Sequence, residues 1–511
     1  MTDSLPTGWA TASLGDICVQ RVPQAPPTEH AVPYIDISAI DRATKRIGET
    51  KLVSAEDAPT RARQWVRAGD VLVSMTRPNL NAVALVHEDL DGAVASTGFD
   101  VLRPVAGLPE WVFYRVRTNE FVADVCEDLQ GVVYPAIRPR DVRRHRLPLP
   151  PEGEQHRIVE ALESYLTRLD DAVAMLERVQ RNLKRYRASV LKAAVEGRLV
   201  PTEAELARAE GRDYEPASVL LERILAERRR RWEDAELAKM KAKGKILKDE
   251  RWRAKYQEPV TPDTSQTNGL PVGWCWVSVE QLGFIASGQT PKGVTSAGAR
   301  DGDVPWFRVG DMNAESNQLL MTVANEWLTT DQVSALGLHV RPIGTIVFPK
   351  RGGAISTNKK RLLGRPAAYD LNTMGVVPIG DVCSYLWVWF LGVDLGSLAD
   401  GSNVPQINHG DIAPLAVPLP PAAEQSRIVN EVNAVLSVAD EVTTAVSANR
   451  LRSTRLRQSI LKWAFEGRLV DQDPTDEPAS QLLERIRAER ESTDGHLPRS
   501  RRRPRARSSK A

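Results

Sequence analysis

Residues 148–159 read PLPPEGEQHRIV, and residues 418–429 read PLPPAAEQSRIV. Further along, residues 189–200 read SVLKAAVEGRLV, and residues 459–470 read SILKWAFEGRLV. Both pairs of stretches are offset by 270 residues, so neither copy has gained or lost a residue between its two markers. An internal repeat of this length predicts two related structural units.

The segment between the first two markers, from Glu154 to Glu196, is predicted to form one long helix. Apolar residues recur there every seven positions, at Leu162, Leu169, Leu176, Leu183 and Val190. A companion column holds Ile158, Tyr165, Ala172, Val179, Tyr186 and Ala193. Two apolar columns with a period of seven residues are typical of a coiled coil.

The second copy repeats the pattern with two polar interruptions. Its columns are Val432, Ala439, Val446, Ser453 and Ile460, and Ile428, Val435, Val442, Asn449, Leu456 and Trp463. Polar residues such as Ser453 and Asn449 in a coiled-coil core can fix its register. A helix of about 43 residues spans roughly 65 Å, and one deleted residue would rotate everything beyond it by about 100°. A constant length therefore indicates a spacer. Two amphipathic helices in ordinary globular cores are the alternative.

A β-rich segment punctuated by glycine and proline precedes each predicted helix. Residues 5–9, 32–35, 69–72 and 133–137 of the first segment match residues 270–274, 304–307, 344–347 and 403–407 of the second. The offset drifts from 265 to 275 and returns to 270, so the two segments differ in their loops while the helices keep their length.

A third repeated piece follows each helix, at residues 215–224 and 477–486. The predicted organisation is domain 1 at 1–147, a spacer helix at 148–200, a charged helical connector at 201–260, domain 2 at 261–417, a second spacer helix at 418–470, a C-terminal helix at 471–492 and a disordered basic tail at 493–511.

Charge excludes a protein that binds nucleic acid through overall positive charge. The 511 residues carry a net charge of +2, and the tail from His496 to Ala511 holds seven basic residues and no acidic one, so the remainder is at −5. Any DNA binding therefore needs local basic patches or a partner. Four widely spaced cysteines and an N-terminus that does not resemble a signal peptide lead us to expect a cytoplasmic protein.

No motif predicts a catalytic, cofactor-binding or metal site. The sequence contains no phosphate-binding GxxxxGK[ST] loop, no dinucleotide-binding GxGxxG after a strand and no Asp/Asn-Pro-Pro-aromatic loop. The seven histidines show no spacing that suits metal ligands.

The ordered set of duplicated motifs resembles the specificity subunit of type I restriction–modification systems over nearly the whole chain. The resemblance implies two target-recognition domains of mixed α/β (α+β) type, each reading one half of a bipartite DNA site. It also implies two long antiparallel coiled-coil helices, related by a pseudo-twofold internal repeat, that set the distance between the half-sites. Adenine-N6 methylation, with its S-adenosylmethionine, is then expected on a partner modification subunit in two copies, and translocation and cleavage on a restriction subunit.

The predicted DNA-contact loops follow a matched strand in each domain. In domain 2 the candidates are Lys350, Arg351, Asn358, Lys359, Lys360 and Arg361, and in domain 1 they are Arg77, Asn79 and Asn81. In domain 2, Gly352 and Gly353 permit close backbone approach, and Lys and Arg can hold phosphates or read guanine. A solvated, charged turn is the alternative.

A second set of candidates precedes each spacer helix. It consists of Tyr134, Arg138 and Arg140 in domain 1, and of Asn403, Gln406 and Asn408 in domain 2. Amide side chains suit adenine edges, and arginine suits guanine. Hydrogen-bonded turn residues are the alternative.

Several further residues are candidates. Arg143, Arg144 and Arg146 are candidate phosphate contacts, and Lys45, Arg46 and Arg308 are candidate DNA contacts. The arginine run at 228–231 is a candidate for docking on the partner subunit or on DNA, with a solvated helix face as the alternative. Trp9, Trp274, Tyr34 and Trp306 are expected in the core. Two other functional classes stay open: a coiled-coil scaffold whose paired domains bind another ligand, and an enzyme whose site has no recognisable motif.

Overall fold

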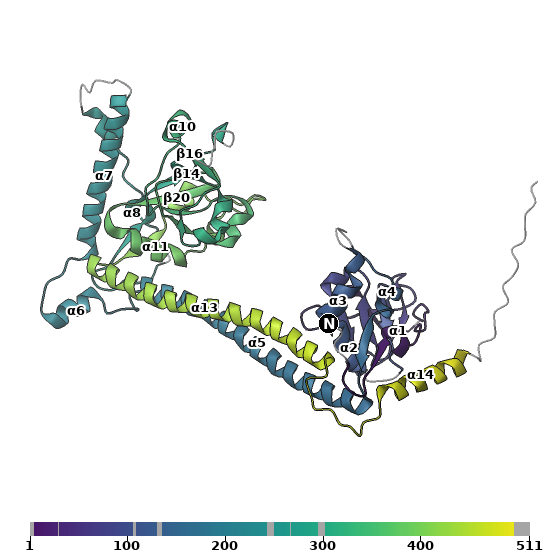
Figure 1. Ribbon diagram of the computed structural model, residues 1–511. Coiled ribbons are helices and arrows are strands. Elements are labelled where there is room, and N and C mark those ends of the chain that lie inside the picture. Colours follow the sequence, from purple (N-terminus) through teal and green to yellow (C-terminus); the bar gives the residue numbers. More distant parts are fainter. Residues whose placement is uncertain are drawn as a thin grey trace, which may run out of the picture. The chain divides into compact units, whose positions relative to one another are not determined.

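The computed structural model describes residues 5–28, 30–105, 109–129, 135–242, 250–265, 267–294 and 302–494 (Figure 1). Tyr134 and residues 495–511 of the predicted tail lie outside the described residues. The chain divides into two compact units: unit 1 holds residues 1–178 and 446–511, and unit 2 holds residues 179–445. Each unit combines one β-rich domain with a segment of each long helix.

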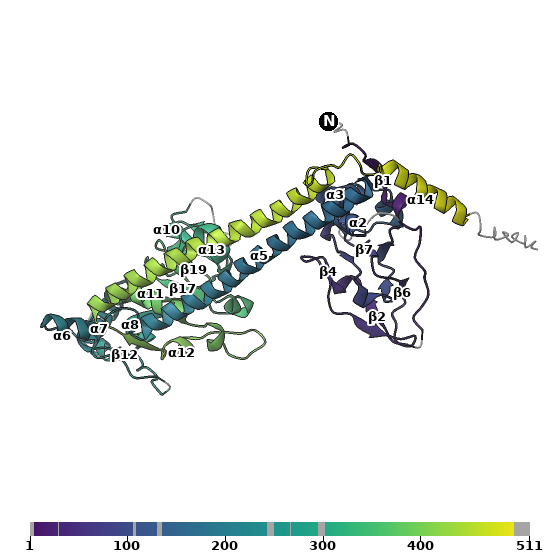
Figure 2. The same cartoon turned by 90° about the horizontal axis from the view of Figure 1, so that it is seen from below.

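The two predicted long helices are confirmed. In unit 1, Asp170 of one helix forms an ion pair with Arg457 of the other. In unit 2, Arg187 of the first helix forms an ion pair with Asp440 of the second. Within each unit the two helical segments run side by side and antiparallel (Figure 2). The helices are α5 at Glu152–Val195 and α13 at Ala422–Phe465, each of 44 residues.

One of the two predicted apolar columns of α5 is confirmed only in part, because Ile158 is fully buried and Val179 is half-buried but other members are exposed. The column from Leu162 to Val190 is buried or half-buried, as predicted. At several turns the buried companion lies four residues further on, not three. Leu166 and Ala194 are 4% and 0% exposed, whereas Tyr165 and Tyr186 are 47% and 52% exposed. With 3.6 residues per turn, positions three and four residues away both flank a column, and packing selects one of them.

The same shift occurs on α13. Leu456 and Trp463 of the predicted companion column are 44% and 46% exposed, whereas Ala464 is fully buried. Asn449 is exposed as well, so it does not fix the register from within a core, contrary to the prediction.

Domain 1 is built from short sheets, and most of its strands precede its helices in the chain. The strands pair as β10–β7–β8, β5–β2–β9–β6, β3–β4 and β1–β11. Their bounds are β1 Ala10–Ser13, β2 Val32–Ile35, β3 Ile40–Asp41, β4 Arg46–Ile47, β5 Lys51–Val53, β6 Ala62–Trp65, β7 Val71–Ser74, β8 Val83–Leu85, β9 Val94–Ser96, β10 Phe99–Leu102 and β11 Arg146–Leu149. The helices of unit 1 besides the long pair are α1 Leu14–Ile17, α2 Pro109–Val116, α3 Asn119–Val125, α4 Pro139–Arg143 and α14 Ala479–Asp494.

Domain 2 has a related but larger arrangement. Its strands pair as β13–β20–β17–β18–β15, β16–β14–β19 and β12–β21. Their bounds are β12 Cys275–Ser278, β13 Gly283–Ser287, β14 Val304–Phe307, β15 Leu320–Met321, β16 Glu326–Leu328, β17 Ile346–Pro349, β18 Arg361–Leu363, β19 Ala368–Tyr369, β20 Thr373–Pro378 and β21 Ala416–Leu419. The shorter helices of unit 2 are α6 Glu203–Glu210, α7 Ala217–Ala242, α8 Val279–Leu282, α10 Thr330–Ala335, α11 Cys383–Gly392 and α12 His409–Ile412.

Both domains contain a parallel strand pair in a mixed sheet, namely β2 with β9 and β14 with β19. In each domain the first strand also pairs antiparallel with the strand just before the long helix, as β1–β11 and as β12–β21. The duplication predicted from the repeat and the mixed α/β architecture implied by the resemblance are therefore confirmed.

The repeated motifs contact one another where each domain meets a long helix. The indole nitrogen of Trp9 donates to Oε2 of Glu154 at 2.9 Å, and that of Trp274 donates to Oε1 of Glu424 at 3.1 Å. Burial raises the pKa of both carboxyl groups. Both tryptophans are 8% exposed, so their predicted place in the core is confirmed.

The last turn of each long helix packs against the opening of a domain. Gly467 follows α13 with a φ of 66°, and a Cβ on it would lie 2.5 Å from Cγ of Pro6. Gly197 follows α5 with the same φ, and a Cβ on it would lie 2.5 Å from Cγ of Pro271. Glycine is therefore required at each position for two reasons. The backbone is left-handed, and a side chain would clash with the proline.

Candidate nucleic-acid interface

The two predicted loops of domain 1 lie side by side. The backbone N–H of Arg77 donates to the carbonyl of Pro135 at 2.8 Å, and that of Ile137 donates to the carbonyl of Met75 at 2.9 Å. An isolated β-bridge joins the same two segments. Residues 75–81 and residues 135–140, which are far apart in sequence, therefore form one surface.

Domain 2 repeats this pairing. The N–H of Gly352 donates to the carbonyl of Pro405 at 2.7 Å, and that of Ile407 donates to the carbonyl of Lys350 at 2.8 Å. A β-bridge again joins the two segments, here between Arg351 and Gln406. The sequence predicted each loop separately, and the structure brings the two together in both domains.

In domain 1 the paired loops present mainly guanidinium groups. Arg77, Asn79, Arg138 and Arg140 are exposed. The side chain of Arg140 is 74% exposed and lies 3.5 Å from Asp141, a pair too exposed to hold the arginine firmly. The surface therefore offers several cations that a phosphate or a guanine edge can recruit.

In domain 2 the paired loops present both cations and amides. Arg351, Asn403 and Asn408 are exposed, and Lys350 and Gln406 are half-buried. The amide nitrogen of Gln406 donates to Oδ1 of Asn408 at 2.6 Å. The ammonium group of Lys350 donates to Oγ of Ser287 at 3.1 Å.

Two predicted contact residues instead anchor their loops. Asn81 and Asn358 adopt left-handed backbone conformations, with φ of 47° and 51°, at the ends of short 3₁₀ turns. The Asn81 amide donates to the carbonyl of Val116 at 3.1 Å, and Oδ1 of Asn358 accepts from the N–H of Leu395 at 3.0 Å. Each asparagine thus ties its loop to the segment at the end of the next major helix, and we remove both from the proposed interface.

The basic cluster after Asn358 is also partly structural. Lys360 is 5% exposed, and its ammonium group bonds Oδ1 of Asn358 and the carbonyl of Val393. Burial lowers the pKa of Lys360 to about 8. Arg361 is half-buried and donates to the carbonyl of Met312 at 3.1 Å. Lys360 is therefore withdrawn as a phosphate contact, and Arg361 becomes a weaker candidate.

Of three further basic candidates, two form ion pairs with acidic side chains and one does not. Lys359, which is half-buried, bonds the neutral side chain of Asn313. Arg308 forms an ion pair with Glu326. Arg143 forms an internal ion pair with Asp100 at 2.8 Å. Of these, only Lys359 keeps a place in the proposed interface, because its neutral partner leaves the positive charge uncompensated.

Lys45 and the remaining arginines likewise differ in whether the side chain is bonded within the domain or exposed. Lys45, which is half-buried, bonds the carbonyl of Asn81, and burial lowers its pKa to about 8, so we leave it out of the proposed interface. Arg46 and Arg146 are exposed, and Arg144, also exposed, lies 3.9 Å from Asp141.

Comparisons with known proteins give one consistent result. No protein-family model matches the chain. The specificity subunit of the type I restriction enzyme EcoKI of Escherichia coli K12 is 24% identical over 529 residues, which cover 96% of this chain and 97% of that subunit. The EcoDI specificity subunit of Escherichia coli is 25% identical over 414 residues, covering 77% and 80%. The HindI specificity subunit of Haemophilus influenzae is 26% identical over 355 residues, covering 65% and 70%.

Solved structures agree with this at the level of the fold. The HsdS subunit of Thermoanaerobacter tengcongensis matches with a TM-score of 0.51 at 24% identity, covering 91% of this chain and 99% of that chain. A chain from a structural study of the assembly of a type I restriction–modification system matches with a TM-score of 0.64 at 24% identity and the same coverage. The chain resembles type I specificity subunits in sequence and in fold. The resemblance inferred from the repeated motifs is confirmed.

The paired loops belong to the two domains and not to the long helices, as expected for a type I specificity subunit.

The arginine run at 228–231 on α7 does not offer a free basic face. Arg228 is 7% exposed, donates to the carbonyl of Gly283 at 3.0 Å and lies 4.4 Å from the ring centre of Phe284. Its neighbours pair with Glu227 and Glu233 on the same helix.

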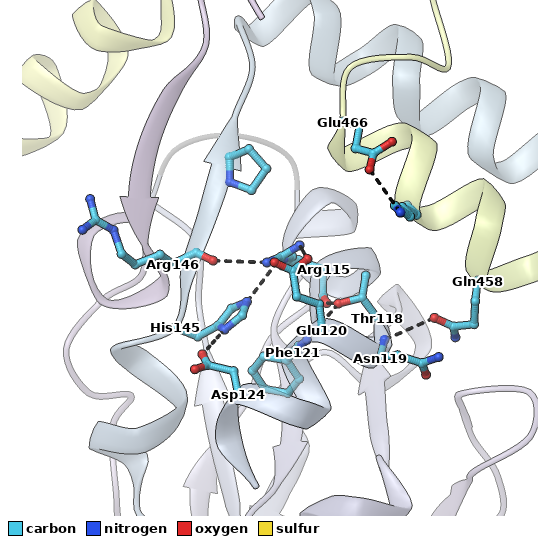
Figure 3. Close-up of polar contacts among 12 residues, drawn as sticks. Arg115, Thr118, Asn119, Glu120, Phe121, Asp124, His145, Arg146, Gln458 and Glu466 are labelled. Carbon is cyan, nitrogen blue, oxygen red and sulfur yellow. Dashed lines mark hydrogen bonds and ion pairs between the residues drawn. The ribbon is translucent and has the colours of Figure 1, made fainter. Parts of the chain in front are cut away.

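A polar network that the sequence did not predict lies at the base of domain 1 (Figure 3). The Nε–H of Arg115 donates to Nε2 of His145 at 2.9 Å, and Nδ1 of His145 contacts Asp124. Burial lowers the pKa of His145. Beside this network, Oε1 of Gln458 on α13 accepts from the N–H of Asn119 at 3.2 Å. No spacing in the sequence connects these residues, because they meet only through the tertiary fold.

A cavity of about 660 Å³ adjoins this network within unit 1, lined among others by Leu147, Phe465 and Lys462. It lies between domain 1 and α13, and no residue of the paired loops lines it. In the described part of the chain, no cluster of three or more His, Cys, Asp or Glu side chains could hold a metal ion. No described helix is both long and apolar enough to span a membrane.

Proposed function

We propose that this chain is the DNA sequence-specificity subunit of a type I restriction–modification complex. Each domain reads one half of a bipartite, gapped DNA site through its two paired loops. The antiparallel helices hold the two readers at a set separation. The observation that carries the proposal is the recurrence of the same pair of inter-loop hydrogen bonds in both domains, on a repeat whose helices kept an identical length.

In this proposal, partner subunits carry out the catalytic steps. The sequence holds none of the motifs for a nucleotide or a methyl donor. We therefore assign S-adenosylmethionine and adenine-N6 methylation to a modification subunit, present in two copies, and translocation and cleavage to a restriction subunit. This chain binds and aligns the DNA and catalyses no step. A cytoplasmic location stays a prediction.

The physical logic of a split site supports the proposal. Half-sites one helical turn apart are separated by about 34 Å, whereas a 44-residue helix is roughly 66 Å long. Such a helix is long enough to keep two readers a turn of DNA apart. The exposed cations on the loops supply the positive potential that the chain as a whole lacks.

Reconstitution with a modification subunit from the same host tests the proposal. We expect adenine methylation at one split sequence when both subunits and S-adenosylmethionine are present, as mapped by sequencing of the modified DNA, and none from this chain alone. Methyl transfer by the isolated chain would refute the noncatalytic assignment. Methylation that follows no split sequence, together with no DNA binding, would favour the scaffold alternative.

A further inference from the structure

The two domains carry different side chains at equivalent backbone positions in the paired loops. Arg138 precedes α4 and Asn408 precedes α12, and the backbone N–H of each is capped by the aspartate three residues later, at 2.9 and 2.6 Å. Two residues earlier, Ala136 and Gln406 each form the β-bridge to the partner loop. Because the backbones match and the caps are supplied by the aspartates, the side chains at these positions are available for another role.

In domain 2 the side chains form a prearranged amide pair. Gln406 donates one hydrogen of its amide nitrogen to Oδ1 of Asn408 at 2.6 Å. A glutamine amide has a second hydrogen and a carbonyl oxygen, and these are the donor and the acceptor that a bidentate contact to an adenine edge requires. With Oδ1 of Asn408 as the acceptor, the bond holds the Gln406 side chain at the edge of the loop and limits the directions in which its amide can face.

Domain 1 offers the opposite chemistry at the same place. Ala136 has no polar side chain, and Arg138 is exposed and carries only donors. A guanidinium group cannot accept from the amino group of adenine, but it matches the two acceptors of a guanine edge.

We infer that Gln406, held in place by Asn408, reads an adenine in the half-site of domain 2, and that Arg138 reads a guanine in the half-site of domain 1. The inference rests on the proposed function and adds to it the base that each domain recognises at this position. Gln406 and Arg138 are the reading residues, whereas Asn408 is a positioning residue.

The test uses the full chain in complex with its modification subunit, and maps methylated DNA from a random-sequence library. We expect Gln406→Ala to relax one adenine position of one half-site by about 10- to 100-fold and to leave the other half-site unchanged. Gln406→Glu should move the preference at that same position from adenine to cytosine, because a carboxylate accepts from the cytosine amino group but cannot donate. Arg138→Ala should relax a guanine in the other half-site.

Asn408 is tested by two variants that separate positioning from phosphate binding. Asn408→Ala should weaken discrimination at the Gln406 position only. Asn408→Asp keeps the accepting oxygen, so it should retain the adenine preference while its negative charge lowers affinity for all sequences alike. Gln318→Ala removes an exposed glutamine elsewhere in domain 2 and should change neither half-site.

The outcomes also separate this inference from the proposed function. A wild-type complex that methylates a split site, with Gln406→Ala leaving every position unchanged or relaxing a base other than adenine, would overturn the adenine assignment while the function stands. An unchanged guanine preference in Arg138→Ala would overturn the guanine assignment in the same way. A wild-type complex that methylates no split site would overturn the proposed function and this inference together.

Discussion

Asp170 of α5 forms an ion pair with Arg457 of α13, and the 270-residue offset of the repeat carries this pair onto Asp440 and Arg187, which form an ion pair of their own. One pair lies in unit 1 and the other in unit 2. The repeat therefore preserves an individual contact between the helices as well as their length. In both units the contact identifies the antiparallel register.

The ion pair between Asp170 and Arg457 is expected to fix the register of the two helices more than to stabilise the fold. The Asp170 side chain is 59% exposed and that of Arg457 is 23% exposed, and exposed ion pairs typically contribute about 0.2–1 kcal/mol. In a double-mutant cycle with Asp170→Arg and Arg457→Asp, we expect each single variant to lower the melting temperature and the double variant to recover most of the loss. Additive losses, with no recovery, would show that the two side chains do not interact.

The basic loop of domain 2 should act on DNA through charge. If Lys350 and Arg351 hold phosphates, the double alanine variant will weaken binding to all sequences, and the slope of log affinity against log salt will flatten by up to about two units. If one of them reads a base, specificity will relax only in the second half-site. Binding can be measured by fluorescence anisotropy over a salt series. Lys239→Ala, on α7, is the matched control for loss of an exposed lysine. Affinity and specificity both equal to wild type would remove this loop from the interface.

The junction between helix end and domain opening should depend on Gly467. Gly467→Ala puts a Cβ into a left-handed backbone and against Pro6, whereas Gly211→Ala meets the same backbone restriction, at a φ of 62°, with no atom within 4 Å. We expect Gly211→Ala to lower the free energy of unfolding by about 1–2 kcal/mol, and Gly467→Ala by roughly 1–3 kcal/mol more. Chemical denaturation measures both values. Equal losses in the two variants would mean that the contact with Pro6 is unimportant.

The network around His145 predicts a pH dependence of domain 1. The folded state lowers the pKa of His145, chiefly by burial and also through the nearby positive charge of Arg115, although Asp124 and Glu120 oppose the shift. Nε2 accepts from Arg115, which requires the neutral ring. Stability from this group is therefore fully present above the unfolded-state pKa of about 6.5 and is lost as the pH falls through the lower folded-state value.

Melting temperatures between pH 5 and pH 8 will show this loss in wild type. His145→Gln should be less stable at pH 8 but should lose less on acidification. The repeat places Leu415 at the matching position of domain 2, so the effect should be confined to unit 1. Parallel curves for wild type and His145→Gln would contradict the assignment.

The sequence predicted those features that depend on period and repetition. The seven-residue period and the constant offset predicted two long helices of equal length, which the structure shows with 44 residues each. The matched strands placed the loops at Lys350 and Arg77 in equivalent positions. The companion column was confirmed only in part because the alternative column contains the half-buried Arg187, so it looked less apolar than the predicted column with Tyr165 and Tyr186. In the thin interface between two helices, arginine stems and ion pairs take places that the pattern assigns to apolar residues.

The site residues were harder to predict, because exposure depends on the tertiary fold. Lys360 and Lys359 are adjacent in sequence, yet the first is buried against the segment after α11 and the second keeps its charge accessible. Likewise, Asn81 is indistinguishable from Asn79 in the sequence, and only its left-handed backbone and its bond to Val116 reveal an anchoring role. Composition identified the loops, but it did not tell reading residues from anchors.

Changing the helix length tests whether the helices measure the distance between half-sites. One heptad is inserted after Leu176 of α5 and one after Val446 of α13, positions that the repeat matches, and the methylated sites of the reconstituted complex are mapped. Seven helical residues add about 10 Å, so we predict the two wild-type half-sites with a gap longer by about three base pairs. Insertion into α5 alone should abolish split-site methylation, because the two helices no longer share a register. An unchanged gap after the double insertion would contradict the spacer role of the helices.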